Sequence, residues 1–289
     1  MSPAVPGVRD KTALARMPGL GAGYLRLLTR LGGGRVAQSS MPFVSVDHWQ
    51  CDAGHLARYM HFCGFRGECP PITYPQVAAM PLLLRCATQP GFPVSPLGLV
   101  HRFSRFEWLR WPIPRLAGRW KCRLVACKRT DAGLELTMET RLDDAAGPLW
   151  CGVMGMLAEP VRGMSGVGQP AALTGSSGEL LFPENCGRGY ARVSGDWNPI
   201  HLARIGAALF GQRRSIAHGM FSLARVLVAS DFRPASRLEV TFRRPIRLPA
   251  RTCWLQQCED GGRRLQLWSV DRQHLHLDAR AECARKEHE

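Results

Sequence analysis

The chain has 289 residues, 45% of them hydrophobic, and carries 38 lysines and arginines against 23 aspartates and glutamates, a formal net charge of +15. That length suits one large domain or two ordinary ones, and the apolar content allows a substantial core. No run approaches the roughly 18 apolar residues of a membrane-spanning helix, so no transmembrane segment is predicted, while the charge leaves open either an anionic partner or a merely basic protein.

Eleven cysteines are scattered along the chain without a paired pattern. Cys122 and Cys127 share a five-residue offset with Cys253 and Cys258, but no further cysteine pair or histidine cluster completes a zinc site. Such thiols fit a reducing compartment, where most of them would fill the core. The sequence therefore predicts a cytoplasmic protein without a structural metal.

A basic leader occupies residues 1–41. Its segment "TALARMPGLGAGYLRLLTRLGGGR" is weakly amphipathic, but Pro18 and several glycines interrupt it. These breaks predict a disordered or loosely docked leader, with a helix lying on a membrane surface as the alternative.

Residues 42–160 read as a first repeat rich in strands. An apolar helix is predicted over 72–88, although Pro75 and Pro81 put its start in doubt. An alternating strand then reaches a Pro-Ile corner, and a hairpin follows with its turn at 131–133. The strand "PLWCGVMGMLAEP" would close this sheet.

A linker rich in Gly, Ser and Pro is predicted at 161–180, followed by a second repeat at 181–285. This repeat starts with a short helix over 202–211 and a helix over 218–230 that is apolar on nearly every face. Long alternating strands come next, including a hairpin that turns at 260–262.

The two repeats match in order. "YMHFCGF" aligns without gaps on "YARVSGD", which pairs Tyr59 with Tyr190 and Phe65 with Asp196. Each half continues with an apolar helix, an alternating strand, a Pro-Ile corner and a hairpin. We interpret this as a degenerate duplication, in which each half wraps an antiparallel sheet around a helix; chance similarity between two strand-rich halves is the alternative.

The stretch "YARVSGDWNPIHL" carries the candidate chemistry. Pro199 excludes a regular helix and pushes Asn198 out of the helical region, so a turn can bring Asp196 and His201 to one side. A carboxyl group and an imidazole that share a cavity can exchange protons with a ligand. The alternative is a polar turn in which His201 only bonds the backbone.

A second element follows at "AHGMFSLARVL". Gly219 stands at the predicted start of the buried helix, where a backbone N–H would point at a ligand oxygen and polarise a thioester carbonyl. The alternative is that this glycine only allows tight helix packing.

Together, "YARVSGDWNPIH", "AHGMFSLARVL" and "VTFRRPIRLP" resemble the MaoC-like family of (R)-specific enoyl-thioester hydratases and 3-hydroxyacyl-thioester dehydratases, over roughly residues 42–282. The resemblance implies an α+β double hot-dog fold with a non-catalytic first repeat. It also implies roles for six residues of the second repeat. They are Asp196 and His201 as the catalytic dyad, Gly219 as the thioester-binding residue, and Ser194, Gly195 and Asn198 as substrate-binding loop residues.

The resemblance implies a reversible syn hydration of trans-2-enoyl thioesters to (3R)-hydroxyacyl thioesters, in fatty-acid metabolism and without a cofactor. The substrate would be an acyl-CoA or an acyl chain on acyl carrier protein, and the enzyme a monomer or homodimer. Phe65 in place of the aspartate implies one active site per chain. The apolar helix of the first repeat would then line an acyl pocket, through Met80, Leu82, Leu83 and Leu84.

Arginines near the second corner could bind coenzyme A phosphates or an acidic carrier protein, or simply form a solvated face. They are Arg213, Arg214, Arg243, Arg244 and Arg247. "RFSRFEWLRW" superficially resembles a nucleic-acid platform, but strand alternation explains it better, so no nucleic-acid partner is predicted. The rival functions are a catalytically silent hot-dog protein that binds acyl thioesters or serves as an assembly subunit, and a thioesterase.

Overall fold

The computed structural model describes residues 13–29, 41–110, 116–158, 169–231 and 235–283. The first predicted Pro-Ile corner and residues 161–168 of the predicted linker lie outside these residues.

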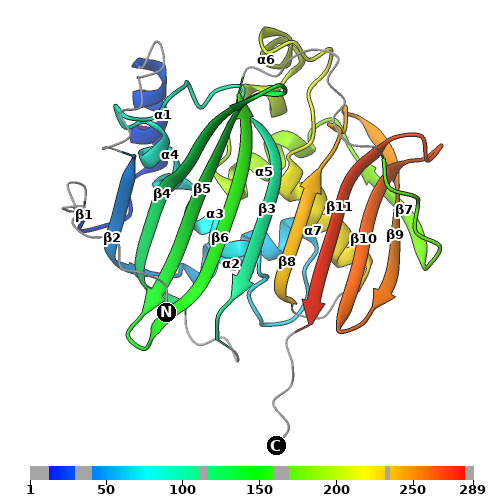
Figure 1. Ribbon diagram of the computed structural model, residues 1–289, viewed down its shortest axis with the longest axis horizontal. Helices are drawn as coiled ribbons and strands as arrows, with labels where there is room; N and C mark the ends of the chain where they lie inside the picture. Colours follow the sequence, from blue (N-terminus) through cyan, green and yellow to red (C-terminus); the bar gives the residue numbers. More distant parts are fainter. Residues whose placement is uncertain (1–12, 30–40, 111–115, 159–168, 232–234, 284–289) are drawn as a thin grey trace, which may run out of the picture.

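One eleven-stranded sheet dominates the described structure, in the order β1-β2-β4-β5-β6-β3-β8-β11-β10-β9-β7 (Figure 1). The bounds of its strands are β1 Ala13–Leu14, β2 Phe43–Gln50, β3 Val100–Trp108, β4 Ala117–Thr130, β5 Gly133–Asp144, β6 Gly147–Ala158, β7 Ser177–Phe182, β8 Ala235–Phe242, β9 Ala250–Glu259, β10 Gly262–Ser269 and β11 Leu275–Cys283. The predicted hairpins are therefore correct, with β4 and β5 joined at 131–132 and β9 and β10 at 260–261.

The strand order repeats within this sheet. In the first half, β2-β4-β5-β6-β3 places the strands as first, third, fourth, fifth and second, and β7-β9-β10-β11-β8 repeats that arrangement in the second half. The two halves meet edge to edge where β3 pairs antiparallel with β8, with Phe106 opposite Leu238. The sheet topology is therefore that of a double hot-dog, as predicted.

Most of the helices lie behind the sheet in Figure 1, with α6 above its upper edge and α1 at its upper left. Their bounds are α1 Leu20–Thr29, α2 Ala53–Cys63, α3 Tyr74–Ala78, α4 Met80–Ala87, α5 Cys186–Ser194, the 3-10 helix η1 Pro199–His201, α6 Arg204–Leu209 and α7 Gly219–Ala229. The single helix predicted over 72–88 is wrong in one respect, because Pro75 and Pro81 each start a separate short helix and divide the segment at Ala79.

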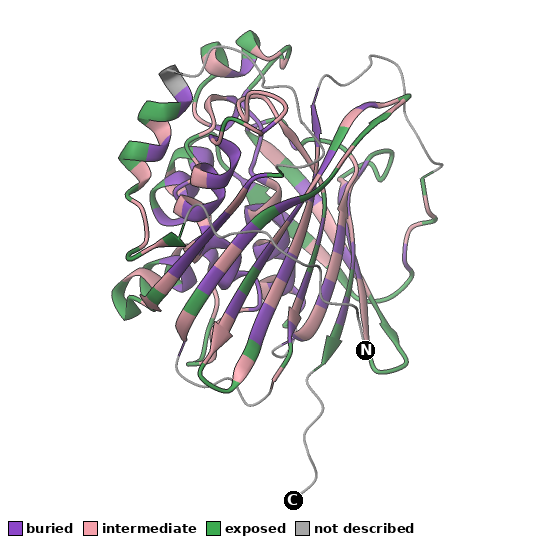
Figure 2. Cartoon of the chain, turned by 60° about the vertical axis from the view of Figure 1, so that its left-hand side comes forward, coloured by how far each residue is buried: buried purple, intermediate pink, exposed green. Residues whose placement is uncertain are grey.

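Aromatic packing joins the two repeats behind the sheet. Tyr59 and Phe62 of α2 lie 6.4 Å from the ring of Tyr190 on α5, and Phe62 lies 5.3 Å from Phe221 on α7. Helix α7 is buried nearly all round, as its apolar sequence predicts. In Figure 2 the buried residues gather in the helices behind the sheet and alternate with more exposed residues along the strands. The core therefore continues across the repeats and is not divided between them.

Part of the leader folds onto the first repeat. Strand β1 pairs parallel with β2, with Ala13 opposite Ser45, and helix α1 contacts α4. Leu27 of α1 is buried, and Gly23 lies against the side chain of Leu84. Residues 13–29 therefore differ from the expectation of disorder, because the apolar side of this weakly amphipathic segment packs on helix α4. No helix in the described ranges is both long and apolar enough to cross a membrane.

Candidate active site

Asp196 lies where helix α5 ends. Gly195 caps that helix in the left-handed conformation, with φ 73°, and turns the chain toward the interior. The Ser194 hydroxyl oxygen accepts a hydrogen bond from the Asp196 N–H at 3.2 Å, and the Asp196 carboxylate accepts one from the Asn198 N–H at 3.1 Å. Its side chain keeps a third of its surface exposed. The aspartate thus stays open to a ligand while its backbone is held.

His201 closes the turn that Pro199 starts. Asn198 is extended, with ψ 124°, as the following proline requires, and its side chain accepts a bond from the Ile200 N–H at 3.5 Å. The buried His201 ring places Nδ1 2.8 Å from the carbonyl oxygen of Ile216. A carbonyl oxygen only accepts hydrogen bonds, so Nδ1 carries the proton and Nε2 of the neutral ring has the lone pair.

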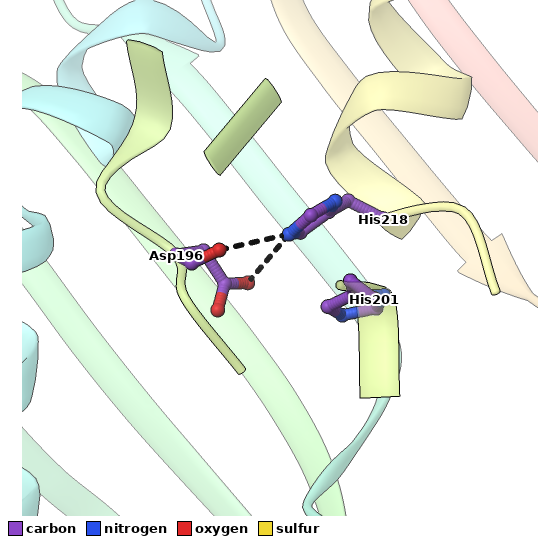
Figure 3. A group of neighbouring side chains, drawn as sticks. All are labelled: Asp196, His201 and His218. Atoms are coloured by element: carbon purple, nitrogen blue, oxygen red, sulfur yellow. Dashed lines mark hydrogen bonds and ion pairs between the residues drawn. The ribbon is translucent and has the colours of Figure 1, made fainter. Parts of the chain in front are cut away.

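His218 is a third polar residue of the site, which sequence reasoning missed. It precedes Gly219 directly and caps the start of α7. Figure 3 shows its ring stacked on that of His201, with 3.7 Å between ring centroids. Its Nε2–H donates to the backbone carbonyl of Asp196 at 3.0 Å and lies 3.8 Å from the Asp196 carboxylate. The signal available in the sequence was a histidine at the first turn of the central helix.

Burial keeps both stacked histidines neutral. Desolvation lowers the pKa of His201, and the negative charge of Asp196 opposes this shift. For His218, desolvation and then the charge of His201 lower the pKa to about 3. Near neutral pH both imidazoles of the cluster are therefore uncharged.

The first repeat also contributes a histidine. His101 of β3 packs against the ring of Phe242, with 4.6 Å between ring centroids, and its Nε2 lies 2.7 Å from the Ser104 hydroxyl. Desolvation lowers the pKa of His101 to about 4, and the charges of Asp196 and His201 reach it with opposite effects. His101 therefore belongs to the same electrostatic environment as Asp196 and His201.

Asp196, His201 and His218 each place one possible metal-ligand atom within 4.8 Å of the others. A metal bound by both histidines would have to lie close to the plane of each ring. The two rings are stacked with 27° between their planes, so no point within bonding distance of both lies in both planes. The Nε2 of His218 is moreover engaged by the Asp196 carbonyl oxygen. The geometry fits a hydrogen-bonded acid–base cluster better than a metal centre.

Gly219 is the first residue of helix α7. It borders the cavity that Asp196 and His201 also line. The first N–H groups of a helix have no partner within the helix, and the helix dipole favours negative charge there. A side chain at this position would meet the ring of Phe242 at 3.0 Å. Close packing against Phe242 and a position beside the cavity therefore occur together at this glycine, so the two expectations are compatible.

A cavity of about 660 Å³ connects these groups with the first repeat. Ser194 and Asn198 line it, whereas Gly195 borders a smaller neighbouring cavity of about 190 Å³. The far walls are apolar and rich in methionine. They include Val77, Met80, Leu83, Leu84 and Ala87 from the helices, and Met138, Met154, Met156 and Leu157 from β5 and β6. Leu82, which we expected in this lining, is fully buried in the core instead, because it faces away from the cavity on α4.

The predicted arginines divide into two groups. Arg243 and Arg244 line the cavity, whereas Arg213, Arg214 and Arg247 are exposed on the surface without bordering it. Two of the five arginines therefore border the same cavity as Asp196 and His201.

The chain is similar to proteins of one known family. The family model of the MaoC like domain matches residues 170–266. The chain is 31% identical over 245 residues to 3-hydroxyacyl-thioester dehydratase X of Mycobacterium tuberculosis, over 82% of this chain and 87% of that protein. The crystal structure of HtdX of Mycobacterium tuberculosis gives a TM-score of 0.72 at 30% identity, covering 84% of this chain and 100% of the other. A MaoC-like dehydratase from Phytophthora capsici shares the fold at 18% identity, with a TM-score of 0.63 over 85% of this chain and 97% of that chain.

The repeated sheet, the helices that it wraps and the carboxylate–histidine cluster in the cavity define a double hot-dog protein of the dehydratase type. The sequence match over most of the chain makes the assignment specific. The chain belongs to the MaoC-like dehydratase family and is a hydro-lyase.

Proposed function

We propose that the enzyme catalyses the reversible dehydration of (3R)-hydroxyacyl thioesters to trans-2-enoyl thioesters in fatty-acid metabolism, with Asp196 and His201 as the catalytic dyad. The observation that carries the proposal is the bond between His201 Nδ1 and the Ile216 carbonyl at 2.8 Å. That bond leaves Nε2 of His201 as the basic nitrogen, and a ring nitrogen of His201 lies within 4.8 Å of an Asp196 carboxylate oxygen. Both residues line a cavity that continues along an apolar wall.

In the hydration direction, a water molecule lies between the Asp196 carboxylate and His201 Nε2. Nε2 takes one proton from this water, while the carboxylate accepts a hydrogen bond from its other hydrogen and stabilises the imidazolium that forms. The water oxygen adds to the β-carbon, and the electron pair of the double bond moves through the α-carbon to the thioester oxygen.

The Gly219 N–H at the start of α7 stabilises the resulting enolate oxygen. The imidazolium then returns its proton to the α-carbon on the same face, which regenerates neutral His201 and gives syn addition of one water molecule. Dehydration is the reverse sequence, in which His201 takes the α-proton and passes it to the departing hydroxyl group.

The acyl chain would extend between the two repeats, along Met80, Leu83 and the methionines of β5 and β6. Arg243 and Arg244 would receive the phosphates of coenzyme A or of the phosphopantetheine arm of an acyl carrier protein. The cavity volume falls within the range of about 300–1,000 Å³ typical of small-molecule sites.

The test follows the absorbance of the enoyl thioester with crotonyl-CoA, with a longer trans-2-enoyl-CoA, and with the same chains on carrier protein. We expect the band to disappear on hydration, at a rate that falls by about 10² to 10⁴-fold in Asp196→Asn and in His201→Ala. Circular dichroism checks that both variants fold.

A flat trace at every chain length and on both carriers would contradict the proposal and favour a catalytically silent hot-dog protein. Release of free thiol, detected with a thiol reagent, would instead indicate a thioesterase. The rates with coenzyme A and with carrier protein substrates are then compared. The faster carrier is the one whose phosphates we expect Arg243 and Arg244 to bind.

A further inference from the structure

A tyrosine of the leader lies on the catalytic loop. The Tyr24 hydroxyl of α1 donates a hydrogen bond to the Gly195 carbonyl oxygen at 2.8 Å and accepts one from the Trp197 N–H at 2.7 Å. These two backbone groups flank Asp196 on either side. One hydroxyl, 171 residues away from Gly195 in the sequence, therefore holds both ends of the segment that carries the carboxylate.

Other hydrogen bonds on this segment come from the catalytic repeat itself. The Asp196 N–H donates to the Ser194 hydroxyl oxygen, and the Asp196 carbonyl accepts from His218. Tyr24 supplies two further bonds from outside that repeat. With these four bonds the backbone from Gly195 to Trp197 is engaged from both sides.

Helix α1 is fixed well enough to place this hydroxyl. Leu27, one turn after Tyr24, is buried, and Leu20, one turn before it, packs over Gly195 so closely that a side chain at 195 would meet its Cδ1 at 2.8 Å. Tyr24 and Leu27 both line the reaction cavity. Burial and the nearby charge of Asp196 raise the pKa of Tyr24, so the hydroxyl keeps its proton and remains a donor.

We propose that Tyr24 is a positioning residue of this enzyme, which holds the Asp196 loop in its reactive geometry and makes the leader helix α1 part of the active site. The effect on turnover rests on the proposed function, whereas the effect on the loop does not. Tyr24 acts through the backbone on both sides of Asp196 and needs no contact with the reacting atoms. Because a displacement of about 1 Å can cost about 100-fold in rate, a loop held by two fewer bonds loses turnover before it loses stability.

The test is Tyr24→Phe, which removes only the hydroxyl and keeps the ring that packs in α1. We expect kcat to fall about tenfold while KM changes by less than about twofold, because the cavity walls stay in place. Amide hydrogen exchange of the segment 194–198 should accelerate, most clearly at the Trp197 N–H, while the melting temperature stays within a few degrees. The matched control is Leu25→Ala, on the same helix but with a side chain that is 64% exposed, which should leave kcat and exchange unchanged.

The outcomes separate the two proposals. If wild-type protein turns over no enoyl thioester, the proposed function fails, and hydrogen exchange still tests the role of Tyr24. Unchanged exchange at Trp197 in Tyr24→Phe, or faster exchange with unchanged kcat in an active enzyme, overturns the positioning role. Equal losses of kcat in Tyr24→Phe and Leu25→Ala would also overturn it, since they would indicate a general weakening of α1.

Discussion

At His201 the direction of proton transfer depends on which ring nitrogen carries hydrogen. The Ile216 carbonyl fixes the proton on Nδ1, and burial lowers the pKa of the ring, so the neutral form with a basic Nε2 is the resting state. Neighbouring His218 is neutral for the same reason and binds the backbone of Asp196. The two histidines therefore have different tasks although their rings stack.

This assignment predicts the pH dependence of the reaction. Because the active form has neutral His201, kcat/KM should be level above pH 6.5 and fall only below the lowered pKa of His201, by up to tenfold per pH unit. Asp196 raises that pKa, so the acid limb of the residual activity of Asp196→Asn should move to lower pH. A rate that falls as pH rises through neutrality would assign His201 as the acid instead.

At the scale of elements, helix α3 places an amide between the cavity and the sheet. Gln76 is 5% exposed and lines the cavity, and neither its oxygen nor its nitrogen has a hydrogen-bond partner among the described residues. Its oxygen lies over Gly152 of β6, where a Cβ would meet it at 2.9 Å. An unpartnered buried amide costs about 1–3 kcal/mol of folding free energy.

Gln76→Met keeps the volume of the side chain and removes this amide, so we expect the free energy of unfolding to rise by about 1–2 kcal/mol in urea titrations. Gln50→Met, at an exposed position of β2, is the matched control and should change it by less than about 0.5 kcal/mol. A lower stability of Gln76→Met would show that the amide makes hydrogen bonds in solution.

At the scale of the whole molecule, the two repeats share one sheet and one core. Leu238 is fully buried opposite Phe106 on the β3–β8 junction, whereas the ion pair between Arg105 and Glu239 across the same junction, at 2.7 Å, is about half exposed. Apolar packing rather than surface charge therefore joins the repeats, because exposed ion pairs contribute little to stability.

Leu238→Ala should lower the free energy of unfolding by about 2–5 kcal/mol, and Arg105→Ala by less than about 1 kcal/mol. Because the core is continuous, both variants should unfold in one transition by tryptophan fluorescence and by far-ultraviolet circular dichroism. Two separated transitions would show that the repeats fold as independent domains.

Much of the fold could be predicted because its signals are local. The hairpin turns at 131–132 and 260–261, the apolar helix α7 and the turn around Pro199 all follow from residues within a few positions of one another. The internal duplication added the double arrangement. The division of the first apolar helix at Ala79 was missed in detail, although the two prolines that cause it were visible.

The candidate site also combines features that are local in the sequence with features that depend on tertiary packing. The sequence alone singled out Asp196, His201 and Gly219, because a proline-bound turn and a helix start are local features with a recognisable spacing. Only the tertiary structure placed His218, His101 and Tyr24 around Asp196 and His201. It also turned Leu83 and Leu84 toward the cavity and Leu82 into the core. The physical reason is that backbone restrictions and apolar periodicity act over a few residues. The position of the leader helix and the meeting of the two repeats depend instead on packing between segments that lie far apart in the sequence.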